Sequence, residues 1–127
     1  MRNPAEAYGK TANMTVSDPR EFEGSLLIKA ASKLQTAKDT CAKLDPTLTE
    51  ALLYNRKLWS VFATSVVEHD DGLPKEIREN IANLSVFIFK QTSAITSQPT
   101  PEKLDTLINI NRQIAAGLFA RPAGSKD

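Results

Sequence analysis

Apolar residues recur every three or four positions along most of the chain, which is the spacing of one face of an α-helix. Residues 52–62 contain the only tryptophan, and a helix would place Leu52, Asn55, Trp59 and Phe62 on one side. Residues 107–118 repeat the arrangement, with Ile108, Asn111, Ile114 or Ala115, and Leu118. Large apolar side chains on one stripe normally form a core. We therefore expect these two segments to be the paired centre of a helical domain.

Residues that begin and end helices divide the chain into four predicted helices. Their bounds are 18–41, 48–68, 74–95 and 101–119. Asp18 and Pro19 suit a helix start, the stretch 47–50 has the spacing of a capping box, and 97–101 is a linker in which Thr100 caps the last helix. Short connections imply antiparallel neighbours. The predicted fold is all-α: an antiparallel four-helix bundle domain at 18–119, with a flexible N-terminal arm at 1–17 and a C-terminal tail at 120–127.

The predicted third helix is apolar on almost every side between residues 84 and 89. Its core-facing stripe needs only Ile77, Ile81, Leu84 and Ile88. The remaining Val86, Phe87 and Phe89 either complete the core or form a groove for a partner helix. We expect the first helix to be the least firmly held and to leave part of this surface open. The stripe predicted for that first helix is Phe22, Leu26, Ala30, Leu34, Ala37 and Cys41.

Composition and charge narrow the class of protein. The chain has 127 residues, enough for one ordinary domain, and its 16 basic and 15 acidic side chains give a net charge of +1. No overall field therefore favours nucleic acid or an anionic membrane, and a partner contact should depend only weakly on salt. No apolar run approaches the ~20 residues of a membrane-spanning helix, and no secretory signal is visible. With a single cysteine, we expect a cytoplasmic protein that binds no membrane.

Candidate catalytic and metal-binding residues are few. The chain has no glycine-rich phosphate loop, and Cys41 lacks a histidine close enough in the predicted fold to activate it. Residues 68–71, Glu-His-Asp-Asp, offer metal-ligand types, but four consecutive helical residues cannot all turn toward one ion. We expect no enzymatic activity, no cofactor and no metal.

The two Asn-Arg pairs leave two interpretations open. Asn55 and Asn111 can be buried amides that bond to each other or to backbone and fix the alignment of the helices, within a core that includes Trp59 and Phe62. Alternatively, Arg56 and Arg112 project beside them and bind carboxylates or carbonyl groups of a partner.

Several blocks of residues, in order, resemble the FlaF family of flagellar biosynthesis regulators in alphaproteobacteria. The blocks are Ala7-Tyr8, Pro19-Arg20-Glu21 with Glu23, Asn55-Arg56-Lys57-Leu58-Trp59, Leu73-Pro74 with Ile77-Arg78, Leu84 and Thr92, the stretch 107–112, and Gly117-Leu118. The resemblance implies a small non-enzymatic cytoplasmic factor that binds flagellin and supports its production and secretion, in the manner of a chaperone. It also implies work alongside the partner regulator FlbT.

A second hypothesis, from a different class, is a post-transcriptional regulator of flagellin expression that acts through RNA or through a partner regulator. Direct RNA contact needs a basic, aromatic-lined surface, whereas the basic residues here are dispersed along the chain and nearly balanced by acids. We therefore expect no direct contact with nucleic acid. The sequence leaves the oligomeric state open.

Overall fold

A computed structural model of the protein describes residues 19–43, 45–68 and 73–120. These ranges form four α-helices and contain no strand: α2 (Pro19–Lys38), α3 (Pro46–Glu68), α4 (Lys75–Ser97) and α5 (Pro101–Phe119). The predicted all-α bundle is confirmed. The predicted arm, with its Tyr8, and the capping residue Asp18 lie outside the described residues, as does most of the predicted tail.

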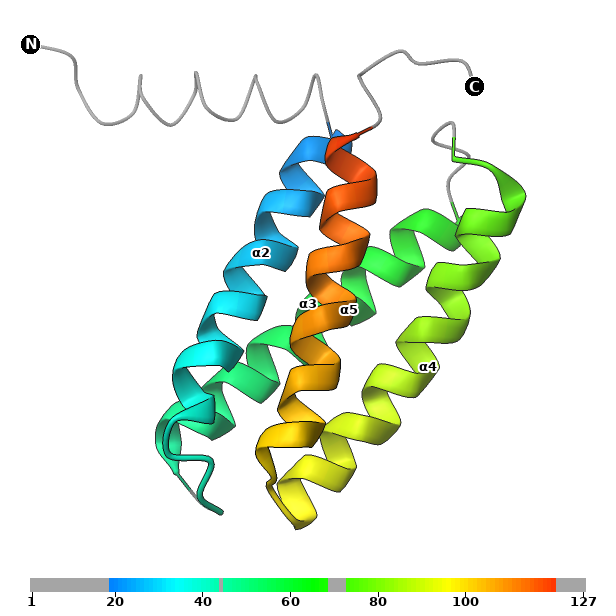
Figure 1. Cartoon of the computed structure of the whole chain (residues 1–127). Helices are drawn as coiled ribbons and strands as arrows, with labels where there is room; N and C mark the ends of the chain where they lie inside the picture. Colours follow the sequence, from blue (N-terminus) through cyan, green and yellow to red (C-terminus); the bar gives the residue numbers. More distant parts are fainter. Residues whose placement is uncertain (1–18, 44, 69–72, 121–127) are drawn as a thin grey trace, which may run out of the picture.

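The helices run up and down, each antiparallel to the one before it (Figure 1). The closest pair is α2 and α5, which lie side by side along their length. Helix α3 packs against both α2 and α4, whereas α4 and α5 make the fewest contacts. In Figure 1, α4 leans away from α5 with increasing distance from the turn that joins them.

Small residues explain the close approach of α2 and α5. Ala30, Ala31 and Ala37 are fully or almost fully buried on α2, so no long side chain separates the two backbones. Near the start of α2, a methyl group added to Gly24 would lie 2.7 Å from the Phe119 ring of α5. The expectation that the first helix is the least firmly held is therefore wrong. The least covered of the four described helices is α4, on its side toward α5.

The buried stripe of α2 differs from the predicted one by a small rotation. Leu27 is fully buried, Leu26 is only half-buried, and Phe22 is 43% exposed. The predicted spacing was correct, but two adjacent leucines cannot be distinguished by spacing alone. Ala30, Leu34 and Ala37 lie in the core as predicted.

Helix α2 also ends earlier than predicted. Its last residue is Lys38, and Cys41 has a left-handed backbone with φ of 45°. The Cys41 amide donates to the carbonyl oxygen of Ala37 at 3.0 Å, which satisfies one of the free carbonyls at the helix end. Asparagine or glycine is more usual at such a position, so sequence alone gave no stop signal there.

The side chain of Asp45 caps the start of α3, so the predicted capping box at 47–50 is wrong. The Asp45 carboxylate accepts a hydrogen bond from the Thr47 amide at 3.2 Å, and Pro46 occupies the first helical position. The pair Asp45-Pro46 therefore starts this helix, two residues before the predicted bound at 48. The predicted cap of α5 is confirmed, since Thr100 accepts from the Lys103 amide at 3.3 Å.

Candidate partner-binding groove

A buried hydrogen-bond network joins three helices at the centre of the bundle. The indole Nε1 of Trp59 donates to Asn111 Oδ1 at 2.8 Å. Asn111 Nδ2 donates to Asn55 Oδ1 at 2.7 Å and to the Leu27 carbonyl oxygen at 3.4 Å. All three networked side chains are fully buried, and Phe62 packs edge-on against Trp59 with ring centroids 5.4 Å apart. The two amides are thus core groups that align α3, α5 and α2.

This network determines where the neighbouring arginines point. Consecutive helical residues are separated by about 100°, so an arginine that follows a buried asparagine turns toward the surface. Both Arg56 and Arg112 are exposed. Arg56 lines a groove between α3 and α4, whereas Arg112 is exposed on α5 and does not line that groove.

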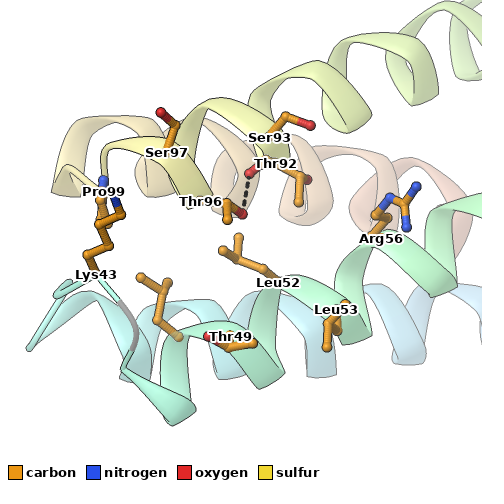
Figure 2. A pocket seen from close by; sticks show the side chains of 11 residues that line it. Lys43, Thr49, Leu52, Leu53, Arg56, Thr92, Ser93, Thr96, Ser97 and Pro99 are labelled. Atoms are coloured by element: carbon orange, nitrogen blue, oxygen red, sulfur yellow. Dashed lines mark hydrogen bonds between the residues drawn. The ribbon is translucent and has the colours of Figure 1, made fainter.

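The groove, here called the α3–α4 groove, consists of two adjoining hollows that share Leu53 and Arg56. Their volumes are about 470 and 690 Å³. Figure 2 shows the first hollow between the two helices, with Lys43 at one end and Arg56 at the other. Along α3 the exposed rim of the groove runs from Thr49 to Val61, roughly 18 Å at 1.5 Å per residue.

The groove exists because α4 presents small side chains to α3 in this region. Thr92, Ser93, Thr96 and Ser97 line it where larger residues would have filled the space. Two of the hydroxyls are bonded within α4: Thr92 donates to the Ile88 carbonyl at 2.7 Å and Thr96 to the Thr92 carbonyl at 2.9 Å (Figure 2). Since these hydroxyls already have partners, the threonines offer mainly their methyl groups to a bound molecule.

Apolar and basic side chains form the rest of the groove lining. Leu48 and Leu52 are buried at its base, while Leu53 is 59% exposed and Val61 63% exposed. The charged lining residues are Lys43, Arg56 and Lys57, and none of the described lining residues of either hollow is acidic. These three cations form no ion pair with any described residue. The surface is therefore apolar, edged with hydroxyls, and locally positive.

The three α4 residues predicted for partner binding, Val86, Phe87 and Phe89, do not lie together in the groove. Phe89 lines the groove beside Arg56 and is half-buried against the core. Val86, one turn earlier, is 52% exposed but outside the groove lining. Phe87 is about 160° around the helix from Phe89. It shares its side of α4 with Gln91, whose amide donates to the Lys103 carbonyl of α5.

Sequence reasoning missed Leu53, Val61 and Lys43 as groove residues. Leu53 follows Leu52 directly, and the core stripe through Trp59 accounted for only one of the two leucines. The signal that could have revealed it is the run of serine and threonine at 92–97, because small hydroxyl residues at helical spacing leave room beside them. Lys43 lies in the turn before α3, so no helical pattern could place it.

The remaining candidate chemistry is sparse in the described ranges. No group of three or more His, Cys, Asp or Glu side chains there is positioned to hold a metal ion, and His69, Asp70 and Asp71 lie outside those ranges. Burial raises the pKa of the Cys41 thiol, and the negative charge of Glu102 raises it further. None of the four described helices is long and apolar enough to cross a membrane.

Comparison with the sequence models of known families identifies the family to which this protein belongs. The sequence model of the family described as "Flagellar protein FlaF" matches residues 4–118, nearly the whole chain. The chain belongs to the FlaF family. Membership assigns it a role in flagellum biogenesis. No curated protein and no solved structure matches the chain, so the roles of individual residues in this FlaF-family bundle come from its own geometry.

Proposed function

We propose that this FlaF-family protein binds flagellin and supports its production and secretion as a chaperone-like factor, without enzymatic activity. The observation that carries the proposal is the α3–α4 groove, an open and largely apolar channel on the surface of the bundle. Flagellin terminal segments are amphipathic helices that must stay apart until export. A groove between two helices suits the apolar face of such a helix.

The dimensions of the groove agree with this occupant. Its length of roughly 18 Å corresponds to about three helical turns of a partner, since one turn rises 5.4 Å. The exposed Leu53 and Val61 supply apolar contact on the α3 side, and Phe89 supplies it on the α4 side. Covering these side chains would remove an apolar strip from water, which favours association.

The lining favours a protein partner over RNA. Single-stranded RNA is normally held by exposed aromatic rings on which bases stack. Among the described residues that line the groove, Phe89 is the only aromatic one, and it is half-buried against the core. We therefore propose that any effect on flagellin expression is indirect, through flagellin itself or through a partner regulator such as FlbT.

Leu53→Asp tests the proposal without disturbing the core, because Leu53 is mostly exposed. A carboxylate in the middle of the groove should weaken flagellin binding at least tenfold in a titration with purified flagellin from the same organism. Cells that carry only this variant should export little flagellin. Ile28→Asp on α2 is the matched control, since Ile28 is an exposed apolar residue away from the groove.

The control variant should bind flagellin as the unmodified protein does, and circular dichroism should show equal helix content in all three proteins. Normal binding by Leu53→Asp would remove the groove from the proposal. A parent protein that fails to bind flagellin in the same titration would overturn the proposed function itself.

A further inference from the structure

The α3–α4 groove brings three cations together, with no acidic residue among its described lining residues. On α2, Lys33 pairs with Glu50 at 3.2 Å and Lys38 pairs with Asp105 at 2.6 Å. By contrast, the three cations of the groove have no acidic partner among the described residues, although the whole chain carries a net charge of only +1. The nearly balanced total charge therefore conceals a local excess of positive charge.

We propose that the groove selects an amphipathic helix whose apolar face is flanked by carboxylates. The inference rests on the proposed function for the location of the site, and it adds the chemistry of the occupant. The apolar face would lie against Leu53 and Phe89, while the carboxylates would meet Lys43 and Arg56 at the two ends of the first hollow. An arginine at one end offers paired N–H donors to a carboxylate, which gives geometric preference as well as attraction.

The positions of the cations define the spacing of those carboxylates. Lys43 and Arg56 lie at opposite ends of the first hollow (Figure 2). On the α3 wall, that hollow runs from Thr49 to Arg56, roughly 10 Å along the helix axis. A helix lying along the groove would span this length in about seven residues, or two turns. Acidic residues about seven positions apart on one flank would therefore reach both ends.

This arrangement reverses the expectation of weak salt dependence drawn from the net charge. Attraction between exposed charges is screened over a Debye length of about 8 Å at physiological ionic strength, so binding through three such contacts should weaken as salt rises. The contribution of each contact is small, but three together should change the affinity by about tenfold.

Two synthetic helical peptides of about 18 residues provide the probe. They share one leucine face and differ only in the flanks, which carry glutamate seven residues apart in one peptide and lysine in the other. In fluorescence-anisotropy titrations the glutamate peptide should bind about tenfold more tightly than the lysine peptide. The triple variant Lys43→Gln, Arg56→Gln, Lys57→Gln should lose that preference and its salt dependence. Arg112→Gln, the exposed arginine of the other Asn-Arg pair, should keep both.

The results of the peptide and flagellin titrations together distinguish a failure of this inference from a failure of the proposed function. Equal affinity for the two peptides, or a preference unchanged in the triple variant, overturns the inference. If flagellin binds through Leu53 but neither peptide binds, the proposed function stands and the charge selection is wrong. If the glutamate peptide binds selectively but flagellin does not, the chemistry of the groove stands and its flagellin assignment fails.

Discussion

Two buried asparagines, each followed by an arginine in the sequence, have unequal roles in the structure. Asn111 takes part in three hydrogen bonds, with Trp59, Asn55 and the Leu27 backbone. Asn55 only accepts one, and its Nδ2 group is buried without a partner. A buried amide that lacks a partner costs free energy, whereas one with all its partners helps to specify a single packing. Asn111 is therefore the central group of the network.

The same substitution at the two asparagines should expose this difference. Asn111→Leu leaves the Trp59 indole N–H and Asn55 Oδ1 unpaired, so it should lower the free energy of unfolding by about 2–5 kcal/mol. Asn55→Leu removes one acceptor along with an amide that had no partner for its N–H groups, so it should cost only about 1–2 kcal/mol. Urea unfolding followed by tryptophan fluorescence measures both. Equal losses would contradict the network as described.

The surroundings of Cys41 predict an effect of pH on stability. Burial, and then the charge of Glu102, raise the pKa of its thiol. A raised pKa means that the folded protein holds this proton more tightly than the unfolded chain does. The stabilising effect of the proton is complete below the unfolded pKa and disappears as pH rises through the folded pKa.

Alkylation by iodoacetamide checks this effect, because the thiolate is the reactive form. At pH 8 the folded protein should react several times more slowly than the urea-unfolded chain, and the difference should shrink as the pH is raised. Equal rates at pH 8 would show that the fold does not raise this pKa.

Among the helices, the small size of the contacting residues sets the close packing of α2 with α5. Two helical glycines make the contrast. Gly24 on α2 is covered by the Phe119 ring, whereas a methyl group at Gly117 on α5 would meet no atom within 4 Å. Helix α5 continues past Gly117 and ends at Phe119, as predicted, so this glycine lies within the helix.

Alanine at these two positions should give different results. Gly117→Ala should stabilise the protein by about 0.5–1 kcal/mol, since alanine loses less backbone entropy in a helix and has free space here. Gly24→Ala gains the same helix propensity, but its methyl group must displace the Phe119 ring. The Gly24→Ala protein should therefore be clearly less stable than the Gly117→Ala protein. Thermal unfolding of both variants ranks them, and a more stable Gly24→Ala protein would contradict the close approach of α2 and α5.

For the whole molecule, the sequence predicted the architecture better than the binding surface. Helical spacing correctly predicted four helices and the buried Asn55, Asn111 and Trp59, because periodicity reports which face is apolar. It placed the start of α3 at 48 and not at Pro46, because a motif such as Asp45-Pro46 can end one helix or begin the next. It also could not foresee the groove, since that depends on the space left between α3 and α4 beside small residues such as Thr92 and Thr96.

The electrostatic character of the binding surface could not be predicted from the sequence either. A count of basic and acidic residues predicts no overall electric field around the protein. The fold nevertheless brings Lys43, Arg56 and Lys57 to one groove that has no described acidic lining residue. These residues come from the turn before α3 and from α3 itself, and only the position of α4 makes them the edges of a groove. Local charge at the groove, and not net charge, should therefore govern partner choice.

The central claim is that the α3–α4 groove receives an amphipathic helix of flagellin. Its most direct test is nuclear magnetic resonance of the isotope-labelled protein titrated with a terminal peptide of flagellin, since every backbone amide then reports on the contact. We predict that the largest chemical-shift changes fall within 48–61 of α3 and 85–97 of α4, with Leu53 and Phe89 among them. Changes centred on α2 and α5, or no changes at a peptide concentration that saturates binding, would contradict the account.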